Sequence, residues 1–139
     1  MARNKVSILI IEDNETDIYL AEAALGYLTD YDVELVIAKD GAAGLKALKA
    51  DDYDVAFVDF NLPKYDGPTI LEKVDQSIRS KCFMLTTSAA DEHIAQVDSL
   101  KVAGYITKPL SQAHFREAMH AVVIVALSKD IKFLHKNRK

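Results

Sequence analysis

Short apolar runs that end in polar residues alternate with amphipathic stretches along this chain, and this alternation restricts its fold more than any other feature. Continuous runs rich in β-branched residues are typical of strands buried on both faces. The amphipathic stretches instead place apolar side chains at helical spacing. We expect strands at residues 6–11, 32–38, 54–58, 81–85 and 104–107, and helices at residues 13–28, 41–50, 68–77, 91–101 and 111–128.

Strict alternation of strands and helices predicts an α/β fold, with a five-stranded parallel sheet and helices on both faces. Right-handed crossovers and a flavodoxin-like strand order, 2-1-3-4-5, satisfy the rules for such connections. The 139 residues suit one domain. We place this domain at residues 1–127, and we expect residues 128–139 to form a basic C-terminal tail or an extension of the last helix.

Polar residues stand at the ends of four of the predicted strands. They are Glu12, Asp13, Asp59, Thr86 and Lys108. The carboxyl ends of parallel strands share one edge of the sheet, where ligands bind in folds of this class, so we expect these side chains to meet. Each residue alone has an ordinary explanation as a turn or cap residue. Together they make one coherent arrangement of charges, and we prefer the functional interpretation.

Three carboxylates crowded at one edge repel one another, and a bound divalent cation relieves that repulsion. Mg²⁺ prefers hard oxygen ligands, including carboxylates and backbone carbonyls. We therefore predict a Mg²⁺ site made by Glu12, Asp13 and Asp59 with the backbone carbonyl of Asn61, and Mn²⁺ is the second candidate cation.

Asp59 is the candidate nucleophile, because a carboxylate can attack phosphorus and form an aspartyl phosphate. Phosphoryl transfer depends mostly on positioning and on stabilising charge at the phosphoryl oxygens. Lys108 is predicted to supply a positive charge to one of these oxygens, and Thr86 is predicted to donate its hydroxyl to another.

Five motifs stand in order along the chain. They are Ile10-Ile11-Glu12-Asp13-Asn14, Val58-Asp59-Phe60-Asn61-Leu62-Pro63, Asp66-Gly67, Leu85-Thr86-Thr87-Ser88 and Gly104-Tyr105-Ile106-Thr107-Lys108-Pro109. With these motifs the chain resembles the response-regulator receiver domains of two-component signalling, over about residues 5–127. The resemblance implies that Asp59 is the phosphoacceptor and that Tyr105 is a switch, which turns inward when Thr86 moves toward the phosphate.

The resemblance further implies a single-domain response regulator that accepts a phosphoryl group from a sensor histidine kinase or a phosphotransfer protein. Residues 61–64 and 85–88 are also similar to regulators that serve bacterial phytochrome kinases, so a bacteriophytochrome is a candidate partner. Phosphorylation is expected to change the face made by the fourth predicted helix (residues 91–101), the fifth strand (residues 104–107) and the last helix (residues 111–128). This face then contacts a downstream protein or a second copy of the chain. No separate turnover activity is expected.

Two other functions are compatible with this fold class. One is a receiver-like interaction adaptor that works without phosphorylation, and the intact acidic set argues against it. The other is a small enzyme. A flavin carrier is disfavoured because residues 12–15 would repel the flavin phosphate. A phosphatase of the haloacid dehalogenase type would need a second aspartate at the position of Asn61.

The net charge of −4, from 17 basic and 21 acidic residues, gives no general case for nucleic-acid binding. No signal peptide and no span of ~20 apolar residues is found, so we expect a cytoplasmic protein that does not enter the membrane.

Cys82 is expected to be a buried, inert thiol. Residues 121–127 are apolar nearly all round, which core packing or association with a partner would explain, and we prefer association.

Overall fold

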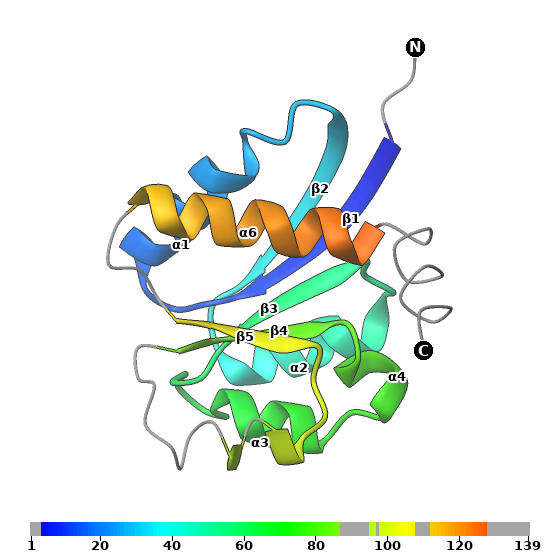
Figure 1. The fold of residues 1–139 in the computed structure, drawn as a ribbon. Helices are drawn as coiled ribbons and strands as arrows, with labels where there is room; N and C mark the ends of the chain where they lie inside the picture. The colour runs from blue at the N-terminus through cyan, green and yellow to red at the C-terminus, as the bar shows by residue number, and fades with distance from the viewer. Residues whose placement is uncertain (1–3, 87–94, 97, 108–111, 128–139) are drawn as a thin grey trace.

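The computed structural model describes residues 4–86, 95–96, 98–107 and 112–127 (Figure 1). Five strands form one sheet in the order β2-β1-β3-β4-β5, and every neighbouring pair is parallel. This result confirms the predicted fold class and strand order. The strands are β1 (Asn4–Ile11), β2 (Tyr31–Ala38), β3 (Val55–Asp59), β4 (Cys82–Thr86) and β5 (Gly104–Thr107).

Helices cover both faces of the sheet, with α1 and α6 on one face and α2, α3 and α4 on the other (Figure 1). Their packing follows from the pleat of the strands, because successive side chains point to opposite faces. The helices are α1 (Glu15–Leu25), α2 (Gly41–Ala50), α3 (Gly67–Glu72), α4 (Gln76–Arg79) and α6 (Gln112–Leu127).

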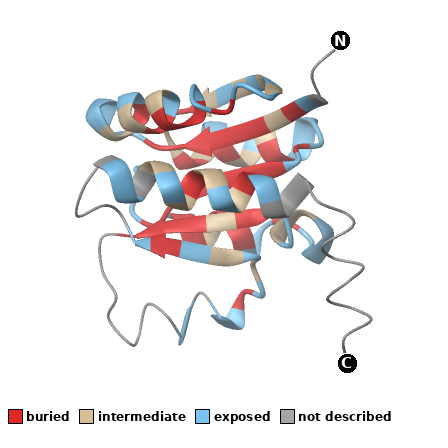
Figure 2. Cartoon of the chain, turned by 45° about the horizontal axis from the view of Figure 1, so that its top comes forward, coloured by how far each residue is buried: buried red, intermediate tan, exposed pale blue. Residues whose placement is uncertain are grey.

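The sheet divides the hydrophobic core into two layers. In β1, Ile8 and Ile10 pack in the layer beneath α1 and α6, whereas Leu9 and Ile11 pack in the layer beneath α2 and α3. All five residues of β3 are buried, and Figure 2 shows the buried residues concentrated along the central strands. Burial on both faces explains why the central strands appear as apolar runs in the sequence, whereas the edge strands β2 and β5 are only partly buried.

Side-chain caps fix where the first two helices begin. Helix α2 has the predicted bounds, and the Ala43 amide donates to Asp40 Oδ1 at 2.8 Å, as expected for an N-cap. Helix α1 begins later than predicted, at Glu15, because Asn14 is its N-cap and accepts from the Asp17 amide at 2.9 Å. It also ends earlier than predicted, at Leu25.

The prediction of one helix at residues 68–77 was wrong, because two short helices, α3 and α4, occupy this region. Asp75 begins the second helix by accepting from the Ile78 amide at 3.2 Å. The Arg79 guanidinium donates to the Val74 carbonyl at 2.7 Å, near the end of the first helix. These side chains satisfy backbone groups at the break, which would otherwise lack partners.

Three predicted features lie wholly or partly outside the described residues. Of the helix predicted at residues 91–101, residues 95–96 and 98–101 are described; residues 95–96 and 98–99 are helical, whereas residues 100–101 form a turn, so the helix ends earlier than predicted. Ser111, the first residue of the last predicted helix, and the tail predicted at residues 128–139 lie outside. Within the described part of the chain, no helix is long and apolar enough to cross a membrane.

Core packing accounts for one side of α6. Met119 and Val123 are fully buried in the layer shared with α1, whereas Ile124 is 44% exposed. The exposed apolar side chain of Ile124 on the outer side of the helix is compatible with the predicted association. That association stays a prediction.

A candidate divalent-cation and phosphoryl site

Three carboxylates meet at one edge of the sheet, as the sequence predicted. Glu12 and Asp13 follow β1, and Asp59 ends β3, which pairs directly with β1. One oxygen from each of the three carboxylates lies within 4.8 Å of the other two. The parallel order of the strands therefore brings together residues separated by more than 40 positions in the sequence.

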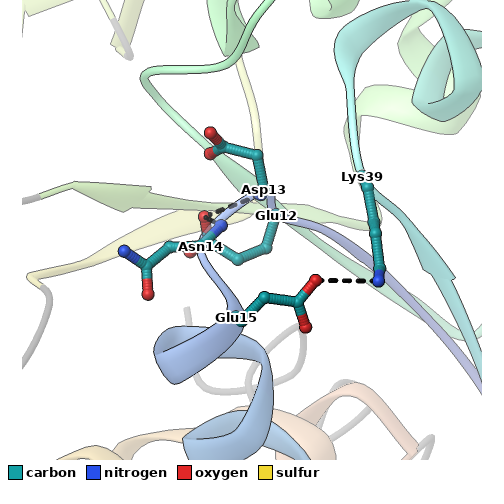
Figure 3. A network of polar contacts seen from close by, with 5 residues as sticks. All are labelled: Glu12, Asp13, Asn14, Glu15 and Lys39. Carbon is teal, nitrogen blue, oxygen red and sulfur yellow. Dashed lines mark hydrogen bonds and ion pairs between the residues drawn. The ribbon is translucent and has the colours of Figure 1, made fainter.

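Two of these carboxylates are removed from solvent. Glu12 is 1% exposed and Asp59 is 5% exposed, whereas Asp13 is exposed. Burying a charged group is costly unless it is paired or hydrogen-bonded. Glu12 Oε2 accepts from the backbone amides of Asp13 at 3.0 Å and Asn14 at 3.3 Å (Figure 3), and Asp59 Oδ1 accepts from the Asn61 amide at 3.3 Å.

The donor set fits a divalent cation of the hard, oxygen-binding class. All three side-chain ligands are carboxylates, and their spacing allows all of them to reach one ion. Because Asp13 is exposed, the site opens to solvent on that side, which suits an ion that keeps several of its waters. Mg²⁺ and Mn²⁺ both prefer this combination of ligands.

Lys39, at the end of β2, lies near the start of α1 and is engaged there with Glu15 (Figure 3). Its Nζ is 2.8 Å from Glu15 Oε1, and both side chains are largely exposed. The hydrogen bond and the attraction of the Glu15 carboxylate raise the pKa of Lys39 above its ordinary value. This ion pair flanks the acidic cluster without joining it.

The other predicted site residues lie on β4, on β5 and beyond it. Thr86 ends β4 and is 3% exposed, and it pairs in register with Thr107 at the end of β5. Tyr105, the predicted switch residue, is 40% exposed on β5. Lys108 lies outside the described residues. Its predicted contact with the phosphoryl group therefore stays a prediction.

The loop that follows Asp59 returns closely to its own start. The Gly67 amide donates to the Phe60 carbonyl at 3.0 Å, and a Cβ on Gly67 would lie 2.5 Å from the Asp59 carbonyl oxygen. Glycine is needed at such a close backbone approach. Asp66 caps α3 by accepting from the Thr69 amide at 2.9 Å. Asp66 and Gly67 therefore have structural roles in this loop, a helix cap and a close backbone approach.

Sequence reasoning missed the contact between this loop and the start of α2. The Gly41 amide donates to the Pro63 carbonyl at 3.0 Å, and Lys64 Nζ lies 3.3 Å from Asp40 Oδ2. The sequence signals for a cap at Asp40 are clear, but a contact with residues more than 20 positions away leaves no local pattern.

Comparison with known proteins identifies related sequences. The family profile described as "Response regulator receiver domain" matches residues 8–120. "Protein MrkE" of Klebsiella pneumoniae is 28% identical over 116 residues, which make up 81% of this chain and 41% of that protein. The chain therefore spans less than half the length of that relative. "Response regulator Rcp1" of Synechocystis is 32% identical over 111 residues, covering 73% of this chain and 75% of that protein.

Solved structures agree with the fold over most of the chain. The structure of the phosphorylated cyanobacterial phytochrome response regulator RcpA matches with a TM-score of 0.79 and 29% identity, covering 91% of this chain and 96% of that one. The Mn²⁺-bound form of response regulator Rcp1 matches with a TM-score of 0.77 and 25% identity, covering 89% and 96% of the two chains.

Proposed function

This chain belongs to the response regulator receiver domain family, and from that premise we propose that it accepts a phosphoryl group on Asp59 and passes the signal on through protein contacts. The proposed donor is a sensor histidine kinase or a phosphotransfer protein. The observation that carries this proposal is the convergence of Glu12, Asp13 and Asp59 within 4.8 Å at the carboxyl edge of the sheet.

The side chains of Glu12, Asp13 and Asp59, with the backbone carbonyl of Asn61, are the proposed ligands of Mg²⁺. When bound, the cation supplies positive charge that offsets the acidic cluster and the incoming phosphoryl group. The donor set and its open side support this assignment. Mn²⁺ is proposed as an alternative cation, and the solved structure of the relative Rcp1 is a Mn²⁺-bound form of that protein.

In the proposed reaction, a carboxylate oxygen of Asp59 forms a bond to phosphorus while the bond between phosphorus and the donor breaks. Negative charge is then stabilised by Lys108 and by the Thr86 hydroxyl. The position of Thr86 supports this role, because Thr86 is buried at the end of β4, which pairs with β3, the strand that ends at Asp59. Because the phosphoryl group stays on the chain until water removes it, we propose no separate turnover of other substrates.

The proposed output surface consists of residues 91–101, β5 and α6. The phosphoryl group adds about −1.5 to −2 charges and strong hydrogen-bond acceptors. Drawing Thr86 toward them would open space that Tyr105, now 40% exposed, can enter. The exposed side chains of Tyr105 and Ile124 support a docking role for this surface, for a downstream protein or a second copy of the chain.

A bacteriophytochrome is the proposed partner kinase. This proposal is supported by relatives at 25% identity or more, because RcpA is described as a cyanobacterial phytochrome response regulator and another neighbour, AtBRR, as a bacteriophytochrome response regulator. AtBRR is 28% identical with a TM-score of 0.68.

Intact-mass measurement after incubation with Mg²⁺ and acetyl phosphate tests the proposed phosphorylation. The wild-type chain should gain one phosphoryl group, and Asp59→Asn should gain none. Asp66→Asn is the matched control, because it makes the same change seven residues further on, where the side chain can still cap α3. A folded wild-type chain that takes up no phosphate would contradict the proposal and favour the adaptor function.

A further inference from the structure

The loop between β3 and α3 contains a strained turn centred on Lys64. Lys64 has a φ of 71°, in the left-handed region that residues with a Cβ rarely adopt. The Tyr65 amide donates to the Pro63 carbonyl at 2.9 Å, which closes a three-residue turn around Lys64. A three-residue turn with positive φ at its centre is rare and strained. Such a conformation persists only when surrounding contacts hold it.

The start of α2 supplies those contacts. The Gly41 amide donates to the same Pro63 carbonyl at 3.0 Å, so this one oxygen accepts two amides. The Lys64 ammonium lies 3.3 Å from Asp40 Oδ2, while the other oxygen of Asp40 caps α2. The Ala43 amide first, and then Lys64, hold the pKa of Asp40 below its ordinary value. Asp40 therefore joins the cap of a helix to the strained turn.

Gly41 allows the two backbones to touch. A Cβ at this position would lie 1.9 Å from the Tyr65 carbonyl oxygen and 2.7 Å from the Tyr65 Cβ. No side chain fits without moving the turn. Helix α2 does not need this contact in order to begin, because Asp40 already caps it. We therefore assign the close approach to holding the loop in place, since the helix can begin without it.

The strained turn follows the proposed metal ligands closely along the chain. Asn61, whose backbone carbonyl is a proposed ligand, is only two residues before Pro63. On the other side, the Asn61 amide donates to Asp59 Oδ1 at 3.3 Å, and Leu62 packs against the core layer beneath α2 and α3. The backbone at Asn61 is therefore held between the carboxylate of Asp59 and the strained turn, with few ways to move.

We propose that Asp40, Gly41 and Lys64 are positioning residues, which hold the strained turn so that the Asn61 carbonyl stays at the metal site and the divalent cation binds tightly. The inference rests on the proposed function, because it assigns a role toward the proposed cation. The competing explanation is that the turn merely connects β3 to α3. In that case its contacts would affect stability and leave metal affinity unchanged.

Titration of the full chain with Mg²⁺ by calorimetry, and with Mn²⁺ by electron paramagnetic resonance, distinguishes the two explanations. Gly41→Ala must displace the Tyr65 carbonyl and should weaken the binding of both cations about tenfold, the effect expected from loss of an outer-shell support. Asp40→Asn keeps the cap and removes the ion pair, and it should weaken binding about threefold, within the range of an exposed pair. Lys64→Met keeps the Cβ and removes the ammonium, so it should weaken binding about as much as Asp40→Asn does, whereas Lys64→Arg should bind like wild type.

Gly104→Ala is the control for a glycine replacement that disturbs packing away from the site. Its Cβ would meet the Phe83 ring at 3.1 Å, at the amino end of β5, opposite the acidic edge. Urea unfolding without metal measures the stability of every variant. If Gly41→Ala does not fold, Asp40→Asn and Lys64→Met still test the proposal.

The two possible failures can be told apart. If wild type binds both cations and the variants of Asp40, Gly41 and Lys64 bind them equally well, the positioning role is overturned and the proposed metal site stands. If wild type binds neither cation, the proposed site itself is contradicted. Weaker binding in Asp40→Asn, Gly41→Ala and Lys64→Met, with unchanged binding in Lys64→Arg and Gly104→Ala, supports the inference.

Discussion

At the scale of single residues, burial decides the chemistry of Cys82. This residue begins β4 and has no exposed surface, and its Sγ lies 3.4 Å from the Ile78 carbonyl oxygen. Burial disfavours the charged thiolate and raises the pKa of the thiol to about 12 from 9.0. The protein therefore has the inert thiol that the apolar surroundings of Cys82 in the sequence predicted.

Cys82 in the folded protein should react very slowly with a thiol reagent such as Ellman's reagent at pH 8, and rapidly in urea. Between about pH 9 and pH 12, the unfolded chain has lost the thiol proton whereas the folded chain keeps it. The folded state then binds more protons, so the free energy of unfolding should fall as the pH rises through this window. Urea unfolding at several pH values measures the trend, and Cys82→Ala should remove this contribution. A reaction with the reagent that is equally fast with and without urea would contradict the prediction.

At the scale of elements, the start of α3 depends on Asp66. Its Oδ1 accepts from the Thr69 amide at 2.9 Å, and Pro68 stands in the first turn, where a missing amide proton is tolerated. Asp66→Ala should lower the free energy of unfolding by about 1 kcal/mol, the usual effect of losing an N-cap. Asp66→Asn should lower it much less, because its carbonyl oxygen can still accept. Urea denaturation measures both, and equal losses in the two variants would show that capping is not the cause.

The elements also show which parts of the fold could be predicted from the sequence. The central strands are apolar runs because both their faces are buried, whereas the edge strand β2 alternates in burial, and all five strands could be located to within one or two residues. The break between α3 and α4 was missed because Ile70, Leu71 and Val74 keep a helical spacing across the start of the break. What ends α3 is partly a contact from Arg79, and such a contact is visible only in three dimensions.

The acidic part of the candidate site could be predicted from the same alternation of strands and helices. The carboxyl ends of parallel strands share an edge, which is enough to bring Glu12, Asp13 and Asp59 together. The turn at Lys64 could not be predicted, because nothing in a lysine signals positive φ. That conformation depends on contacts from α2, a separate element.

At the scale of the whole molecule, the crowded acids should couple the stability of the fold to the cation. A ligand that binds only the folded state, at one hundred times its dissociation constant, adds about 2.7 kcal/mol to the free energy of unfolding. Mg²⁺ should therefore stabilise the protein against urea, relative to the same protein with a chelator. Asp13→Asn should reduce this gain and raise the stability without metal, because it removes one of three mutually repelling charges.

Asp52→Asn is the matched control for this prediction, since Asp52 is exposed in the segment between α2 and β3, at the far end of the sheet. It should leave the gain from Mg²⁺ unchanged. Equal stability of the wild-type protein with Mg²⁺ and with the chelator, at saturating Mg²⁺, would contradict the coupling.

The sheet that separates the two apolar layers has a consequence for how such a protein can diversify. Residues beneath α1 and α6 touch a different set of neighbours from those beneath α2 and α3. Substitutions that reshape the α1 and α6 side can therefore accumulate while the opposite layer, which supports Leu62 and the loop after Asp59, stays as it is. New partners can be acquired in this way on one side of the molecule while the other side maintains the chemistry.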